Sequence, residues 1–279
     1  MLIVKILAGL AAVLVLGFAS LWALGARQPS ASIQKQDRVL FVALKLEDRP
    51  QEGGTDLFAG TALWRSHARF TFIGDTEAHF TDFFLLPADT DYKAGIEAAG
   101  KVADAYVAEV ELLKAPGMAL GLLRAQHLLG ITRRPDGPLP EDVVEGLARP
   151  DVLPTLESAE RTLGLPADTQ VTMMNYLEYL PAPGGDKGPG RKTYQRYGLQ
   201  AMKSVHAVGG QFLFAGKVSK VLVPSKAEAA PTQWDDLAAM IYPDPEAIFY
   251  MEQFEYYRDA HSYRDASLKS SKVVASVSY

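Results

Sequence analysis

Apolar and polar positions follow regular periods most clearly in residues 170–279. Four segments there are rich in apolar, aromatic and β-branched residues, which predicts strands at 170–179, 211–218, 234–242 and 272–278. Apolar side chains between these segments recur every three or four positions, which predicts helices at 190–208 and 246–268. Glycines 209 and 210 follow the first helix, where helices commonly end.

The order of these elements is βαββαβ. This order predicts an α+β fold, a ferredoxin-like module that occupies residues 169–279. A strand, a helix, two strands, a helix and a strand can also be assigned to residues 38–115, with the first helix at 55–67. Residues 69–74 resemble residues 211–216, so the chain is predicted to hold two tandem modules joined by a helical connector at 116–168. Chance similarity between two strand segments is the alternative.

The N-terminal pattern is different, because residues 6–26 contain no charged side chain. A helix of this length spans about 30 Å, the thickness of a bilayer core. The prediction is a membrane anchor at residues 1–27, followed by a linker at 28–37, with the globular part on the exported side because the N-terminal tail is short. A cleaved signal peptide, with its cleavage site near residues 23–25, is the alternative.

Composition narrows the function classes. The net charge of −5 and the absence of any long Lys/Arg run argue against nucleic-acid binding. The chain has no cysteine, which excludes disulfides and thiolate chemistry. No signature of a nucleotide, a metal or a serine nucleophile is present, so no metal site and no cofactor are expected.

Several short motifs, in their order and spacing, resemble the DUF1330 family over about residues 153–279. They are Leu153-Pro154-Thr155-Leu156, Val171-Thr172-Met173-Met174-Asn175, Tyr194-x-x-Tyr197-Gly198, Gly209-Gly210, Phe214-Ala215-Gly216, Trp234-Asp235 and His261-x-x-Arg264. The chain departs from the family pattern at Asn175-Tyr176-Leu177, where many members have Asn-Leu-Leu, and in its N-terminal half. The resemblance implies the dimeric α/β-barrel superfamily, which includes monooxygenases, isomerases and haem enzymes, with small-molecule pockets beside the sheet.

Two residues are candidates for catalysis. His261 shares a helix face with Asp265, which could orient the imidazole as a general base; one histidine with a nearby aspartate is a weak signal, and a purely structural role at the edge of the core is the favoured alternative. Asn175 alternates with Met173 and Leu177 on one strand face. Its amide must therefore find a partner in an apolar environment, either a backbone group or a ligand.

Tyr194, Tyr257 and Arg264 are candidates for ligand binding, because they lie on the same predicted helices as the apolar stripe. The resulting hypothesis is a membrane-anchored α/β-barrel protein that binds a small organic molecule in an apolar pocket, with cofactor-independent proton transfer or oxygenation as its chemistry. A non-catalytic sensing or interaction domain is the alternative, and a haem-linked enzyme would require a histidine that faces the cavity. Tandem modules would form an intrachain pseudo-dimer, and a single module would form a homodimer.

Overall fold

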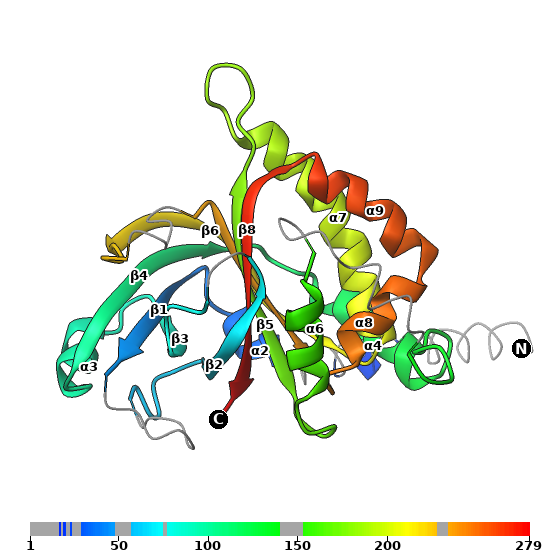
Figure 1. Cartoon of the computed structure of the whole chain (residues 1–279), viewed down its shortest axis with the longest axis horizontal. Coiled ribbons are helices and arrows are strands. Elements are labelled where there is room, and N and C mark those ends of the chain that lie inside the picture. The colour runs from blue at the N-terminus through cyan, green and yellow to red at the C-terminus, as the bar shows by residue number, and fades with distance from the viewer. Residues whose placement is uncertain are drawn as a thin grey trace, which may run out of the picture.

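A computed structural model describes residues 29–47, 57–74, 77–139, 153–227 and 234–279, together with Gly17, Ala19, Ser20 and Ala23. Eight antiparallel strands form one closed barrel, with helices on its outer surface (Figure 1). The strands are β1 (Arg38–Leu46), β2 (Trp64–Ile73), β3 (Asp82–Pro87), β4 (Val102–Leu112), β5 (Val171–Tyr179), β6 (Gln211–Val223), β7 (Asp236–Tyr242) and β8 (Leu268–Ser278). The helices are α2 (Ser30–Ile33), α3 (Tyr92–Ala98), α4 (Gly117–Leu128), α6 (Leu156–Leu163), α7 (Gly188–Ala207), α8 (Ala247–Tyr250), η1 (Met251–Gln253) and α9 (Glu255–Asp265).

The two halves of the chain contribute equally to the barrel. The order around it is β1-β3-β2-β8-β5-β7-β6-β4. The first half therefore reads β4-β1-β3-β2, and the second half reads β8-β5-β7-β6, which is the same order. The halves join at two seams, β2 with β8 and β4 with β6, and all paired strands are antiparallel.

Aromatic and branched side chains fill the interior of the barrel. Successive side chains of a strand point to opposite faces, so Met174 and Tyr176 of β5 face inward while Met173 and Asn175 face the helices. The Tyr176 ring lies 5.9 Å from that of Phe41 and 5.4 Å from that of Trp234, measured between centroids. The interior is thus a packed core, as is common in barrels of eight strands.

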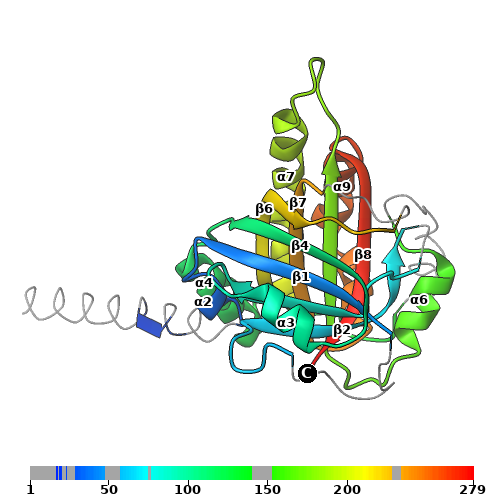
Figure 2. The same ribbon diagram turned by 90° about the vertical axis from the view of Figure 1, so that its left-hand side faces the viewer.

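The outer faces of the two halves are covered differently. Helices α7 and α9 lie against the outside of the second half, while the short α3 and the turn at 57–62 cover the first half (Figures 1 and 2). The Phe58 ring packs so closely on α3 that a Cβ at Gly95 would lie 2.0 Å from it. The close approach requires glycine at this position.

Three expected elements differ from the structure. The helix predicted at 55–67 is wrong, because residues 64–67 belong to β2 and alternate strictly between buried and half-buried positions. The single helix predicted at 246–268 is broken at Phe254, whose backbone is extended (φ −86°, ψ 115°), and β8 already begins at Leu268. The expected linker at 28–37 includes α2, whose Ile33 is buried in the core of the barrel.

The predicted membrane segment lies outside the described residues, apart from Gly17, Ala19, Ser20 and Ala23, each of which is helical. No helix in the described part of the chain has both the length and the apolar character needed to cross a bilayer.

The seam between β4 and β6 provides a test of the barrel. A Cβ at Gly216 would lie 2.5 Å from Val110 Cγ1 and 2.6 Å from the backbone oxygen of Glu111. We expect Gly216→Ala to lower the free energy of unfolding by about 1–3 kcal/mol, because the two strands must move apart. Gly198→Ala is the matched control: its Cβ, within α7, would meet no atom within 4 Å, so the gain in helix propensity stabilises this variant by up to about 1 kcal/mol. Chemical denaturation of both variants measures the difference, and equal stabilities would contradict the close packing of this seam.

Candidate functional site

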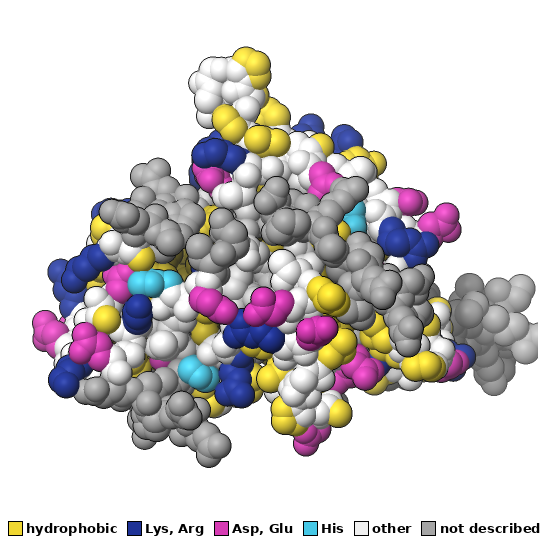
Figure 3. Space-filling view, viewed as in Figure 1, with side chains coloured by type: hydrophobic (Ala, Val, Ile, Leu, Met, Phe, Trp, Pro, Cys, Tyr) yellow, Lys and Arg dark blue, Asp and Glu magenta, His cyan; other side chains and the backbone are white. Residues whose placement is uncertain are grey.

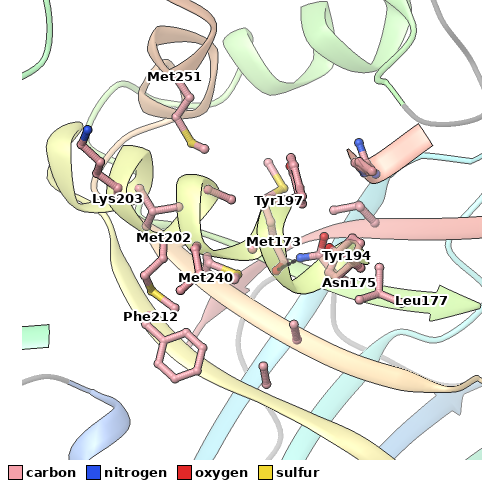
Figure 4. A pocket seen from close by; sticks show the side chains of 18 of the residues that line it. Met173, Asn175, Leu177, Tyr194, Tyr197, Met202, Lys203, Phe212, Met240 and Met251 are labelled. Carbon is pink, nitrogen blue, oxygen red and sulfur yellow. Dashed lines mark hydrogen bonds between the residues drawn. The ribbon is translucent and has the colours of Figure 1, made fainter. Parts of the chain in front are cut away.

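A cavity of about 640 Å³ lies between the outer face of the second-half strands and α7 (Figure 4). This volume is within the range of small-molecule sites. Most of the described residues of its wall are apolar, among them Met173, Leu177, Met202, Phe212, Met240 and Met251. The wall is therefore suited to an organic ligand with a large apolar part.

The cavity exists because small side chains stand where the strands and α7 face each other. Ala215 of β6, Ala238 of β7, and Gly198 and Ala201 of α7 all line it. None of these side chains extends beyond a methyl group, so they leave space that the methionines and tyrosines around them do not fill. The 20-residue α7 spans this gap as one continuous helix, beginning with Pro189 in its first turn, where proline is favoured.

Tyrosines from α7 and α9 meet along the wall. The ring of Tyr197 lies 5.3 Å from Tyr194 and 5.9 Å from Tyr257, and the hydroxyls of Tyr197 and Tyr257 are 3.0 Å apart. Burial raises the pKa of Tyr194 and of Tyr257 above the usual value. These phenols therefore keep their protons at neutral pH and can donate hydrogen bonds to an oxygen in the cavity.

Glu252 is the unusual acid of the site. It lies on the cavity wall at the end of an apolar run, and burial raises its pKa from 4.5 to about 7, although the charges of Arg258 and Arg264 oppose the shift. Its Oε1 is 3.4 Å from Nε2 of His261. A carboxyl group with a pKa of about 7 can give or accept a proton near neutral pH.

His261 is placed behind this wall. Its ring packs 4.9 Å from Tyr257, and among the described residues it is not part of the cavity surface. The carboxylate of Glu252 lies beside its Nε2, at 3.4 Å. The described part of the wall contains no histidine, the residue that the haem-linked hypothesis requires at the cavity.

Arg264 brings a buried positive charge to the cavity. Its side chain lines the wall, its Nη2 donates to Ser271 Oγ at 3.2 Å, and its guanidinium lies 5.8 Å from the centre of the Tyr197 ring. A buried guanidinium can form two parallel hydrogen bonds with a carboxylate. Arg264 is therefore the described residue best suited to hold an acidic group of a ligand.

Asn175 also lines the cavity, on the outer face of β5 (Figure 4). Its Nδ2 donates to the backbone oxygen of Met173 at 2.9 Å, so its amide bonds its own strand. The structure thus brings Asn175, Tyr194, Tyr257 and Arg264 to one cavity, with His261 in contact through Tyr257 and Glu252.

One further cluster borders the cavity. Asp236 is buried and accepts hydrogen bonds from Tyr179 Oη at 2.8 Å and from Arg191 Nη2 at 2.8 Å. Burial raises the pKa of Asp236 above its ordinary value, although Arg191 opposes the shift. This cluster fastens the start of α7 to the sheet.

Sequence reasoning missed Glu252, Asp236 and Arg191. For Glu252 a signal was present, because it is a single acidic residue directly after the apolar stretch Ala247–Met251. Nothing comparable marks Asp236 and Arg191, which are 45 positions apart and meet only in the folded chain.

The raised pKa of Glu252 predicts a pH dependence. A folded-state pKa of about 7 lies above the unfolded value, so the contribution of Glu252 to stability is complete below pH 4.5 and is lost as the pH rises through 7. We expect Glu252→Gln to become more stable than the wild type at pH 8 by on the order of 1–3 kcal/mol, and this advantage to vanish at pH 5. The control is Glu255→Gln, since Glu255 is exposed on α9. Denaturant titrations at both pH values measure the effect, and an equal advantage for both variants would rule out a special carboxyl at 252.

Comparison with known proteins gives few matches. No family model matches the chain, that of the DUF1330 family included, and no curated protein matches it. A solved structure of a protein of unknown function from Rhodopseudomonas palustris is similar with 21% identity and a TM-score of 0.38, over 45% of this chain and 94% of the other. A protein from Fusobacterium nucleatum subsp. nucleatum, provisionally assigned as a monooxygenase, is similar with 8% identity and a TM-score of 0.44, over 87% of this chain and 93% of the other. Both likenesses fall below the level at which a shared activity can be inferred.

Proposed function

We propose that this protein binds a small, mainly apolar organic molecule that carries one acidic or carbonyl oxygen. The observation that carries the proposal is the cavity itself, where an apolar wall surrounds the buried guanidinium of Arg264. A site with a large apolar surface and a few convergent polar groups is typical of small-molecule recognition. The oxygen would lie beside Arg264 and Tyr194, and the apolar part would lie along Met173, Met240 and Phe212.

The chemistry proposed for the site is cofactor-independent proton transfer. The Glu252–His261 pair would accept a proton from a carbon next to the ligand carbonyl. The electron pair would move onto the carbonyl oxygen, and hydrogen bonds from Arg264 and Tyr194 would stabilise the resulting enolate. If the ligand has a carbon–carbon double bond next to the deprotonated carbon, return of the proton to the far carbon of that double bond completes an isomerisation with all atoms balanced. Attack of the same enolate on molecular oxygen would instead form a carbon–oxygen bond, and the proton would go to the terminal oxygen to give a hydroperoxide.

The wider assignment belongs to this proposal. The shared strand order of the two halves supports tandem ferredoxin-like modules, at 38–115 and 169–279, that pair within one chain as in the dimeric α/β-barrel superfamily. The proposal also includes membership of the DUF1330 family, a membrane anchor at residues 1–27 and export of the globular part. The charge-free stretch at 6–26 supports the anchor.

A second candidate is a tethered, non-catalytic interaction domain. It is favoured by the interior of the barrel, because side chains such as Phe41, Phe83 and Tyr176 fill the space that the strands enclose. This candidate requires no ligand in the cavity under α7, so direct binding measurements separate the two.

Paired fluorescent probes test the binding proposal. 1-Anilinonaphthalene-8-sulfonate and N-phenyl-1-naphthylamine share an aromatic scaffold, but only the first carries an acidic group. We expect Arg264→Met to weaken binding of the sulfonate probe by about 10–100-fold and to leave the neutral probe unchanged, because a charge-assisted hydrogen bond contributes about 1.5–3 kcal/mol.

The control is Ala201→Phe, which fills the cavity with an aromatic ring. The fluorescence that remains with this variant measures probe bound to the detergent that keeps the full chain in solution. The titrations use the full chain. If neither probe binds the wild type above this background, the second candidate is favoured.

A further inference from the structure

The exposed face of α4 is apolar. Met118 and Leu122, four positions apart, are 46% and 47% exposed, and the chain continues this surface through Leu128, Leu129 and Ile131, all exposed. Single exposed apolar residues are common on protein surfaces, but a continuous face of them marks an interaction site. Figure 3 views the molecule from the side of α6, where hydrophobic, acidic and basic side chains are interspersed, and α4 lies on the far side (Figure 2).

The polar residues of α4 point the other way. Arg124 Nη1 donates to the backbone oxygen of Gly209 at 3.4 Å, and His127 Nδ1 lies 3.1 Å from the backbone oxygen of Ala207. Both side chains thereby bind the C-terminal end of α7, where cationic and donor groups are favoured. The orientation of α4 is therefore fixed with Met118 and Leu122 outward, although Leu120 on its inner side is also apolar and is buried.

The start of α4 is attached to the segment that follows the charge-free stretch. Lys114 Nζ donates to the backbone oxygen of Gln34 at 3.0 Å, and the Ala115 N–H donates to Gln34 Oε1 at 3.2 Å. Gln34 directly follows α2, and α2 lies beside α4 on one side of the molecule (Figure 2). Residues 6–26, which hold no charge, end only a few positions before α2. A membrane anchor there would hold α4 close to the bilayer.

The opposite side of the same helix forms part of the cavity. Ala119, Leu120 and Leu123 of α4 line it, together with Pro116. One helix thus separates the proposed ligand site from the exposed apolar face.

We infer that the exposed face of α4 lies on the lipid bilayer, and that the cavity beside it takes its ligand from the membrane. This inference rests on the proposed function, since it requires the anchor and the cavity. The ligand class is then a lipid-soluble amphiphile with one acidic or carbonyl oxygen. The cations at the edge of the face have acidic neighbours, Lys114 with Asp37 and Arg133 with Asp136, so the contact is mainly hydrophobic and does not require anionic lipid.

Site-specific fluorescence tests the docking. The chain has no cysteine, so a nitrobenzoxadiazole label on Leu122→Cys reports a single position. Leu156→Cys is the matched control, because Leu156 is 48% exposed and lies on α6, on the other side of the molecule (Figure 2). Full chains are placed in phosphatidylcholine vesicles with and without doxyl-labelled lipid. We expect the label at 122 to lose most of its fluorescence to doxyl lipid, and the control to be quenched by aqueous iodide instead.

Absence of doxyl quenching at 122 would overturn the inference, whatever the result with iodide. Access to iodide would then place the face in water, and protection from iodide would show that a second copy of the chain or residues 1–28 cover it. The two naphthalene probes are titrated into the same labelled chains. If the probes bind but the label at 122 is not quenched by doxyl lipid, only this inference is wrong. If the label is quenched but the probes do not bind, the proposed function of the cavity is wrong.

Discussion

Closure of the barrel is the constraint on which the rest of the structure depends. A sheet of eight strands has unpaired edges unless its first and last strands meet, and here the seams β2–β8 and β4–β6 pair both edges of each half. Once the barrel is closed, every strand has one face inside and one face outside. The inward residues, such as Tyr176 and Phe41, must fill a fixed volume, and the outward residues must be covered by helices.

The outer layer is where the two halves diverge. In the first half, the Phe58 ring and the short α3 cover the strands in tight contact, which leaves no room even for a Cβ at Gly95. In the second half, the long α7 crosses the strands where their alanines face the small residues of the helix, and the wall of the resulting space includes Glu252 and Arg264. The two halves thus share a strand order but not an outer layer, since closure of the barrel needs only the strands from each.

The sequence predicted correctly those elements in which the spacing of apolar residues within the element decides which face is buried. The strand expected at 170–179 is observed at 171–179, and the helix expected at 190–208 is observed at 188–207, because alternating or three-to-four spacing decides which face is buried. It failed at 64–67, where Arg65 and His67 interrupt the apolar residues and only pairing with β3 and β8 reveals the strand. The candidates Asn175, Tyr194, Tyr257 and Arg264 could be chosen from spacing alone. The cavity they share could not, because it is made by small residues from separate strands and a helix, and the pKa of Glu252 depends on burial by distant segments.

The seam between β2 and β8 also has a consequence for synthesis of the chain. It pairs His67 in the first half with Val277 in the last strand, residues that are far apart in the sequence. While the ribosome is still making the second half, the edges of β2 and β4 have no partners. Pairing of such distant segments is slow, and exposed strand edges invite association with other chains. In the nascent chain the edge of β4 therefore stays open until β6 has been made, and the edge of β2 stays open until β8 has been made.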